Sequence, residues 1–345
     1  MARLGRGSAP NALRNRVRDR FEYAAAWLII KPLGLLPRRV ARATGRMIAW
    51  TVYLAHRRLR RTAERNLAIA FPQQKSADEE AHIIKGVFRN MGNLLGEVSQ
   101  FPKLSREKIG RLVFYDGLEN YERAAKKGRG VLFLTGHFGA WELCAFAHGA
   151  FGYKLNFLVR PLDNPLLERF VNAYRCRSGN STIDKNNSVR EVMKALKRQE
   201  AVGFLVDVNT LPDQGVFCDF FGVPACSSSG LAVFALRSGA PVVPGFLLWD
   251  PVAGQYRLRF EPEVELTRTG DFKEEVQINT AKFAKIIEDY ARRYPDQWLW
   301  VHRRWKTRPP GEPDLYSGDH GKQIGDAGQA KLGAGATGIK AGTPH

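Results

Sequence analysis

The chain has 345 residues, of which 44% are hydrophobic and 25% are charged. This ordinary globular composition excludes wholesale disorder. The 53 Lys+Arg against 34 Asp+Glu give a net charge of +19. Residues 1–70 hold 16 basic and only 3 acidic residues, so 13 of the excess charges lie in the first fifth of the chain. Large apolar residues are mixed with these arginines, which favours an anionic membrane surface as partner and argues against nucleic acid.

Cysteine and histidine spacing indicates no metal, cofactor or disulfide framework. The chain contains no C-x-x-C or H-x-x-x-H pattern and no glycine loop typical of nucleotide binding. We therefore expect the four cysteines to be small reduced residues, mostly buried: Cys144, Cys176, Cys218 and Cys226.

The first 72 residues predict a basic flexible arm over 1–20 and a membrane-associated helical region over 21–72. The apolar run 23–37 is about 15 residues long and contains Lys31 and Pro32, whereas a clean span needs roughly 20. The run is expected either to insert into or embed deeply in the bilayer, with Lys31 extending to its surface, or to lie at its interface. No secretory signal is recognisable, so we expect the rest of the chain to stay on the cytoplasmic side.

From about residue 119 the hydrophobic periodicity alternates between helices and strands, after one long helix that begins at Ser76. Ser76 and Glu79 form a capping-box pattern at the start of the first helix. The predicted helices cover 76–98, 119–128, a segment after 137, a segment from about 164, 188–199, 228–238 and 272–294. The predicted strands cover 131–135, 154–160, 201–208, 241–249 and 255–262. This order predicts an α/β fold over 73–312, with a largely parallel sheet flanked by helices, followed by a disordered glycine-rich tail over 313–345.

A histidine and a glutamate stand five residues apart in "TGHFGAWEL" (135–143), directly after a buried strand. Ligands gather beyond the carboxyl ends of parallel strands, which is where His137 lies. Five helical residues rotate by roughly 140°, so His137 and Glu142 can meet only if His137 precedes the helix. A carboxylate on one ring nitrogen would leave the other nitrogen free to take a proton from a hydroxyl. The alternative is that His137 caps the helix and Glu142 is a surface residue.

Other titratable or polar residues have simpler interpretations. His148 lies on an apolar stretch and is expected to be a core histidine. The serines at 227–229 are expected to cap the helix that follows. The segment "WLWVHRRW" (298–305) is read as partly structural, with basic residues for an anionic lipid or an acidic carrier protein.

"TGHFGAWEL" resembles the H-x4-D/E block of glycerolipid acyltransferases, and its Glu variant resembles the late acyltransferases of lipid A biosynthesis (lauroyl and myristoyl transferases). Further blocks follow in that family's order and cover roughly residues 20–313. They are "RRTAERNLAIAFP" (60–72), "VRPLDNP" (159–165), "YRCRSGNSTID" (174–184), "FLVDVNT" (204–210), "GVFCDFFGVPACSSSG" (215–230) and "YPDQWLWVHRRWKTRPPGEP" (294–313). The departures are local, such as Val208 and Asn209 in place of the usual Gln and Asp.

The resemblance implies an inner-membrane O-acyltransferase that moves a fatty acyl chain from acyl carrier protein to a hydroxyl of a lipid A precursor. It implies His137 as general base, Glu142 as its partner, and no cofactor. Arg160, Arg177 and Asp207 match later blocks and are expected to contact substrate, the two arginines through phosphate.

Two alternatives stay open from the sequence. The acceptor could be another lipid, such as a lysophosphatidate or a mannosylated phosphoinositide, although no Pro-Glu-Gly-type phosphate motif of the glycerolipid enzymes is found. In the other alternative, the chain is a non-catalytic basic protein at the membrane, and His137 and Glu142 are structural.

Overall fold

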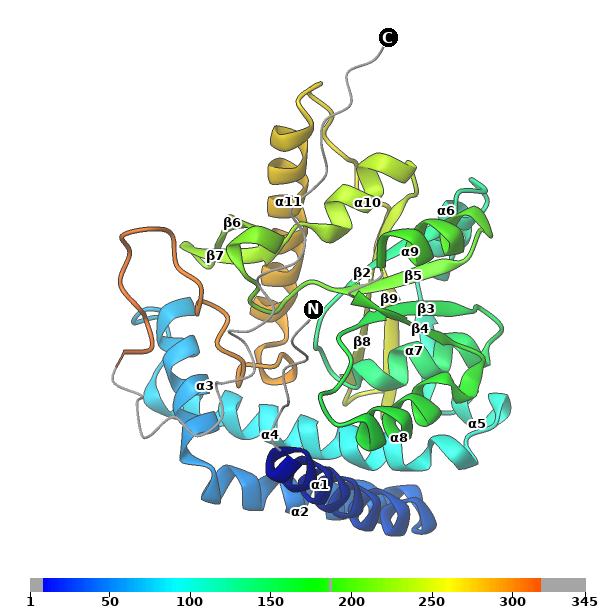
Figure 1. Ribbon diagram of the computed structural model, residues 1–345, viewed down its shortest axis with the longest axis vertical. Helices are drawn as coiled ribbons and strands as arrows, with labels where there is room; N and C mark the ends of the chain where they lie inside the picture. Colours follow the sequence, from blue (N-terminus) through cyan, green and yellow to red (C-terminus); the bar gives the residue numbers. More distant parts are fainter. Residues whose placement is uncertain (1–8, 186–187, 318–345) are drawn as a thin grey trace, which may run out of the picture.

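A seven-stranded sheet forms the centre of the computed structural model, which describes residues 9–185 and 188–317 (Figure 1). The strand order is β1-β9-β8-β2-β5-β3-β4. All neighbours pair in parallel except β8 and β9, which form an antiparallel hairpin. The strands are β1 (Val113–Asp116), β2 (Val131–Thr135), β3 (Leu155–Val159), β4 (Ser181–Asp184), β5 (Ala201–Leu205), β8 (Val242–Asp250) and β9 (Gln255–Phe260). The prediction of a largely parallel, mixed α/β sheet is confirmed.

Helices cover both faces of this sheet, because its central strands are apolar on both sides. Leu132 and Leu134 of β2 join one buried core, whereas Val131 and Phe133 join the other. The first core lies under α9 (Ser188–Lys197), α10 (Gly230–Ser238) and α11 (Phe272–Arg293). The second lies under α6 (Leu118–Ala125), α7 (Trp141–Ala150) and α8 (Pro165–Arg175). Other helical elements in this part of the chain are α4 (Ala77–Gln100), α5 (Arg106–Gly110) and the short turns η1 (Phe101–Lys103), η2 (Cys176–Ser178), η4 (Pro212–Gln214) and η5 (Pro295–Gln297).

Local helix signals in the sequence are found where they were expected. Ser76 and Glu79 form both hydrogen bonds of a capping box at the start of α4. Asn164 caps α8, accepting from the N–H groups of Leu166 and Leu167. Such caps satisfy backbone donors that a helix leaves unpaired at its first turn.

Four short strands were missed from the sequence. β1 and β4 are only four residues long and lie at the two edges of the sheet. β6 (Gly215–Phe220) and β7 (Val223–Ser228) form a separate hairpin. Its turn, Phe221-Gly222, has positive φ at both residues, the conformation of a tight type I′ hairpin. With four residues each, β1 and β4 are too short for their periodicity to be recognised.

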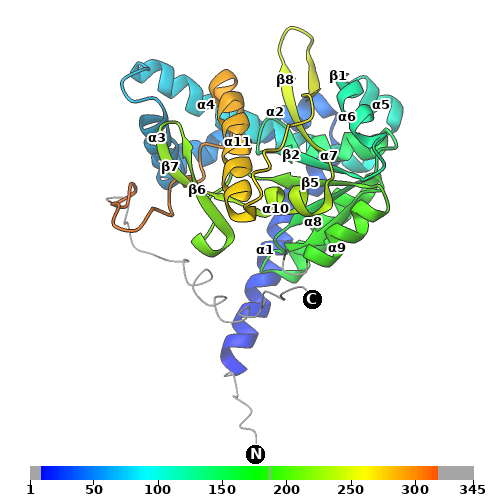
Figure 2. The ribbon, with the colours of Figure 1, turned by 90° about the horizontal axis from the view of Figure 1, so that it is seen from above.

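Three helices precede the sheet: α1 (Ala9–Leu35), α2 (Arg38–Ala55) and α3 (Arg57–Ala70) (Figure 2). The arm expected over 1–20 is helical from Ala9 onward, and residues 1–8 lie outside the described residues. Within 9–185 and 188–317, no helix is both long enough and apolar enough to cross a membrane.

Residues 313–317, which the sequence analysis placed in the tail, belong to the folded part of the chain. Tyr316 is buried, its hydroxyl donates to Asn66 Oδ1 at 2.5 Å, and the N–H of Trp305 donates to that hydroxyl at 3.1 Å. These contacts make 313–317 part of the folded chain. The rest of the predicted tail, 318–345, lies outside the described residues.

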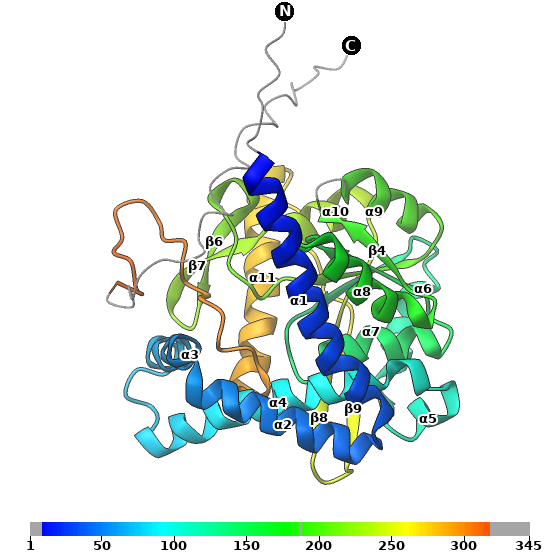
Figure 3. The same cartoon turned by 60° about the horizontal axis from the view of Figure 1, so that its bottom comes forward.

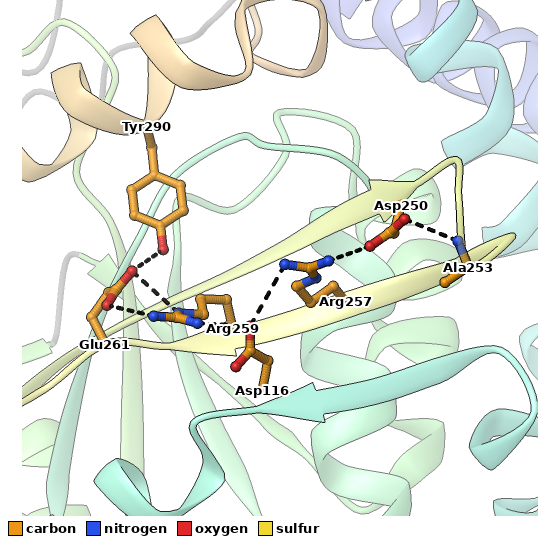
Figure 4. Close-up of polar contacts among 7 residues, drawn as sticks. All are labelled: Asp116, Asp250, Ala253, Arg257, Arg259, Glu261 and Tyr290. Atoms are coloured by element: carbon orange, nitrogen blue, oxygen red, sulfur yellow. Dashed lines mark hydrogen bonds and ion pairs between the residues drawn. The ribbon is translucent and has the colours of Figure 1, made fainter.

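Paired charges line the end of the sheet formed by β1, β8 and β9 (Figure 4). Arg259 donates to Asp116 across the parallel pair at 2.8 Å, and Arg257 pairs with Asp250 across the hairpin. Tyr290 of α11 donates to Glu261 at 2.6 Å. These contacts connect β9 to its two neighbouring strands and attach α11 to the end of β9. Each half-exposed ion pair of this kind contributes little to the free energy of unfolding.

Glycines allow α2 and α4 to approach each other closely. A Cβ at Gly92 would lie 2.6 Å from Arg46 Cα, and one at Gly96 would lie 2.7 Å from Arg42 Cα. Arg38 and Arg42 of α2 also pair with the fully buried Glu97 of α4, at 2.6 and 3.3 Å. The packing of α2 against α4 therefore depends on glycines where the helices cross and on the ion pairs of Glu97 beside them.

We expect Gly92→Ala to lower the free energy of unfolding by about 1–3 kcal/mol, because two backbones would have to separate. Gly110→Ala is the matched control, since a Cβ there would meet nothing within 4 Å. Thermal unfolding of both variants checks this, and equal midpoints would contradict the close helix crossing.

Candidate active site

His137 lies in the turn between β2 and α7, as the sequence predicted. The turn is short and sharp, because Gly139 has a φ of 50° and its Cα faces the backbone oxygen of Leu247 without room for a Cβ. The N–H of Gly139 donates to the backbone oxygen of Gln297 at 2.9 Å. The turn is therefore fixed by β8 on one side and by the segment after α11 on the other.

The carboxylate bonded to His137 is Asp207, and this corrects the expectation that Glu142 orients the ring. His137 Nδ1 lies 2.9 Å from Asp207 Oδ1, and the backbone N–H of His137 donates to Oδ2 at 2.8 Å. The reason is topological. β2 and β5 are adjacent parallel strands, so the residues that follow them meet at the same edge.

Asp207 is buried, with 2% of its surface exposed, and its oxygens are well supplied with donors. The indole N–H of Trp298 donates to Oδ2 at 2.9 Å. Burial would raise the pKa of Asp207, but the charge of His137 and hydrogen bonds from His137 and Trp298 outweigh it and lower the pKa to about 2. An ionised carboxylate only accepts hydrogen bonds, so His137 carries its proton on Nδ1.

The other ring nitrogen of His137, Nε2, is then a free base. Among the described residues it has no hydrogen-bond partner, and the side chain is 22% exposed. Burial lowers the pKa of His137, but the charge and hydrogen bond of Asp207, with a further contribution from Glu142, raise it above its usual value. The arrangement gives a base of increased strength that can be reached from outside.

Glu142 lies in the first turn of α7 and forms a two-pronged ion pair with Arg175, the last residue of α8. The Arg175 Nη2–Glu142 Oε1 distance is 2.5 Å, and Arg175 Nε donates to Oε2 at 2.9 Å. Burial lowers the pKa of Arg175, but the hydrogen bond and charge of Glu142 raise it above its usual value. Arg175 therefore stays charged near His137.

An apolar pocket of about 90 Å³ ends on this ion pair. It lies between α1, α4, η1, α7 and α8, and α1 crosses in front of α8 (Figure 3). Its apolar lining residues are Ile30, Val98, Phe101, Phe170, Val171 and Tyr174. A pocket of this kind suits the hydrocarbon part of a ligand.

The two arginines expected to bind substrate lie at opposite edges of the sheet. Arg160 follows β3 at the carboxyl edge, the edge of His137, and is 57% exposed. Arg177 is exposed and precedes β4, so it lies at the amino edge, away from His137. The arginine of this segment that reaches the site is Arg175, which the sequence analysis missed, although it stands two residues from Arg177.

The segment after α11 packs against the residues around Asp207. The N–H of Asn209 donates to His302 Nε2 at 2.9 Å, and burial lowers the pKa of His302 to about 4. Arg304 is fully buried, and its guanidinium donates to the backbone oxygen of Cys226 and to Ser227 Oγ. Ser227 therefore anchors Arg304, and Ser229 makes no side-chain cap on α10, contrary to the expected capping role.

His148 is confirmed as a core histidine. It is buried, its Nδ1 lies 3.0 Å from the Tyr115 hydroxyl, and burial lowers its pKa to about 3. In the described part of the chain, no group of three or more His, Cys, Asp or Glu side chains is arranged as metal ligands.

The fold and this site define an α/β protein with a partly exposed histidine, bonded to a buried carboxylate, at the carboxyl edge of its sheet. Residues 14–307 match the family described as bacterial lipid A biosynthesis acyltransferase, and the chain belongs to that family. It is therefore an acyltransferase.

Three relatives from Escherichia coli (strain K12) show the extent of the similarity. The lipid A biosynthesis palmitoleoyltransferase is 33% identical over 255 residues, which cover 74% of this chain and 81% of the relative. The lipid A biosynthesis lauroyltransferase is 30% identical over 85% of this chain and 95% of the relative. The lipid A biosynthesis myristoyltransferase is 24% identical over 74% and 78%.

We expect Asp207→Asn to lower kcat by about 10³–10⁴-fold, because an amide can stabilise the wrong tautomer of His137. The remaining activity should persist to lower pH. A histidine accepts a proton only above its pKa, and loss of the Asp207 carboxylate would lower the pKa of His137. The pH profile of kcat/KM checks this.

Trp298→Phe serves as the comparison for Asp207→Asn, because it removes one donor to Oδ2 and keeps the carboxylate. Its loss of kcat should be smaller. If the fall of kcat/KM at low pH occurs at the same pH in Asp207→Asn as in the wild type, Asp207 does not set the pKa of His137.

Proposed function

We propose that the protein is a membrane-bound O-acyltransferase. In this proposal, a fatty acyl chain passes from the thioester of acyl carrier protein to a hydroxyl of a lipid A precursor. The observation that carries the proposal is the geometry at His137, whose Nδ1 is bonded to a buried carboxylate and whose Nε2 is free. The names of the relatives support lipid A as the acceptor.

The proposed reaction needs no protein nucleophile. The oxygen of the acceptor hydroxyl bonds to the thioester carbonyl carbon while His137 Nε2 takes the proton of that hydroxyl. The tetrahedral oxyanion then collapses, the C–S bond breaks, and the leaving thiolate receives the proton from His137. Asp207 holds the ring throughout and stabilises its protonated form, as the carboxylate does in a Ser-His-Asp triad.

Glu142 stays in the proposal as the second carboxylate of the site, acting together with Arg175. Its charge raises the pKa of His137, and its bidentate bond fixes the guanidinium at the end of the apolar pocket. A fixed positive group at this place is suited to stabilise negative charge that develops on the thioester oxygen.

We assign the apolar pocket to the acyl chain. A chain entering it would place its reactive end beside Glu142 and Arg175, on the side of His137. Arg160, at the same edge of the sheet, is proposed to contact a phosphate of the acceptor or donor. Arg177 is left out of the proposed site because of its place at the opposite edge.

The first two helices are proposed to bind the inner membrane from the cytoplasmic side. They combine arginines with exposed apolar side chains, which is the composition of helices that lie in a bilayer interface. The exposed apolar residues of α1 and α2 are Val17, Phe21, Trp27, Leu28, Ile29, Leu35, Val40, Met47, Trp50 and Leu54.

His137→Ala should reduce transfer from acyl carrier protein by about 10²–10⁴-fold, because the reaction loses its general base. His82→Ala is the matched control, since His82 lies exposed on α4. Activity of purified His137→Ala equal to the wild type would contradict the mechanism. The acceptor is tested separately by mass spectrometry of lipid A from a strain lacking the gene, where an unchanged acylation pattern would exclude lipid A.

Val171→Trp should shift donor preference toward shorter acyl chains, because the larger side chain fills the pocket. Competition between carrier-bound chains of different length measures this shift. Val189→Trp is the control, because Val189 is exposed on α9. An unchanged chain-length profile would separate the acyl chain from this pocket.

A further inference from the structure

Helix α3 has one strongly basic surface, the α3 basic face, formed by Arg57, Arg58, Arg61 and Arg65. The helix contains five arginines and one acidic residue, Glu64, in its 14 residues. Its buried residues fall on the opposite side: Thr62, Ala63, Asn66, Leu67 and Ala70. The arginines therefore point away from the core.

Most of the positive charge on this face is uncompensated. Arg60 pairs with Glu64 at 3.6 Å, and Arg65 Nε donates to the backbone oxygen of Leu315 at 2.7 Å. Among the described residues, the guanidinium groups of Arg57, Arg58 and Arg61 have neither a hydrogen-bond nor an ion-pair partner. Like charges gathered without counter-charges attract an acidic partner.

The α3 basic face differs in one respect from the neighbouring helices. α1 and α2 expose tryptophan, leucine, isoleucine and methionine, whereas no large hydrophobic side chain of α3 is exposed. Helices that enter a bilayer interface need apolar residues beside their charges. The surface of α3 therefore fits a polar, acidic protein better than a lipid surface.

The inner side of α3 is attached to the segment that builds the site. Asn66 Nδ2 donates to the backbone oxygens of Trp300 and His302 at 2.6 and 2.7 Å. The same segment supplies Trp298, which bonds Asp207. A helix is about 10–12 Å across, so the α3 basic face lies about one helix diameter outside this segment.

We propose that the α3 basic face is the docking surface for the acyl carrier protein. This inference rests on the proposed function, which names that donor. Attraction between the acidic carrier and the arginines brings the thioester to the enzyme, and the carrier's flexible arm delivers it to His137. Electrostatic contacts of this kind act mainly on encounter and weaken as salt rises.

The test is the double variant Arg58→Glu, Arg61→Glu in the full-length protein. Both side chains are exposed, and acidic residues in the first turns of a helix favour the helix dipole, so α3 should be retained. We expect KM for acyl carrier protein to rise by about tenfold or more at low salt, and the difference to shrink at high salt. KM for a small donor, acyl-pantetheine, should not change.

The matched control is Arg190→Glu, Lys197→Glu, which reverses two exposed charges on α9. Binding of all variants to vesicles containing phosphatidylglycerol is measured in parallel. If the double variant on α3 keeps its KM for the carrier but binds vesicles more weakly, the α3 basic face binds lipid. If neither the KM nor vesicle binding changes, the face is only a solvated surface. Either result overturns the inference while the proposed function stands. A wild type that transfers only from acyl-CoA overturns the carrier as donor and the docking surface with it.

Discussion

The buried carboxylate of Asp207 is the contact on which the rest of the site depends. It accepts from the backbone and ring of His137 and from the indole of Trp298, and so joins the ends of β2 and β5 to the segment after α11. Hydrogen bonds to a charged group contribute roughly 1.5–3 kcal/mol each. Because the group is buried and ionised, loss of any donor leaves a charge that is costly in a low dielectric.

The segment after α11 has two functions in this arrangement. It supplies Trp298 to Asp207, and its backbone oxygens accept from Asn66 of α3. Arg304 extends the same segment under the β6–β7 hairpin, where burial lowers its pKa to about 10. His137 is thus held by elements from the start, middle and end of the chain. Rigid support of this kind fixes the orientation of its ring.

Two side-chain pairs make up the site, one hydrogen-bonded and one ionic. His137 faces Asp207, while Glu142 faces Arg175 at the apolar pocket. The proposed reaction places a proton on His137 and negative charge on the thioester oxygen. The carboxylate of Asp207 is positioned for the first change, and the guanidinium of Arg175 is suited to the second. The outer surface also has two parts: α1 and α2 expose large apolar residues together with arginines, whereas α3 exposes arginines without large apolar residues.

By itself, the sequence determined the order of long helices and strands, the parallel sheet, and the place of His137 at a strand end. These features follow from local periodicity, caps and turns, and the sequence blocks indicated the family. Only the tertiary structure decided that Asp207 rather than Glu142 bonds His137, because strand adjacency brings together residues 70 positions apart. It also decided that Arg175, and not Arg177, reaches the site, since Arg175 ends α8 beside Glu142 whereas Arg177 lies exposed in the turn that follows. Partners set by strand order and helix packing cannot be determined from spacing along the chain.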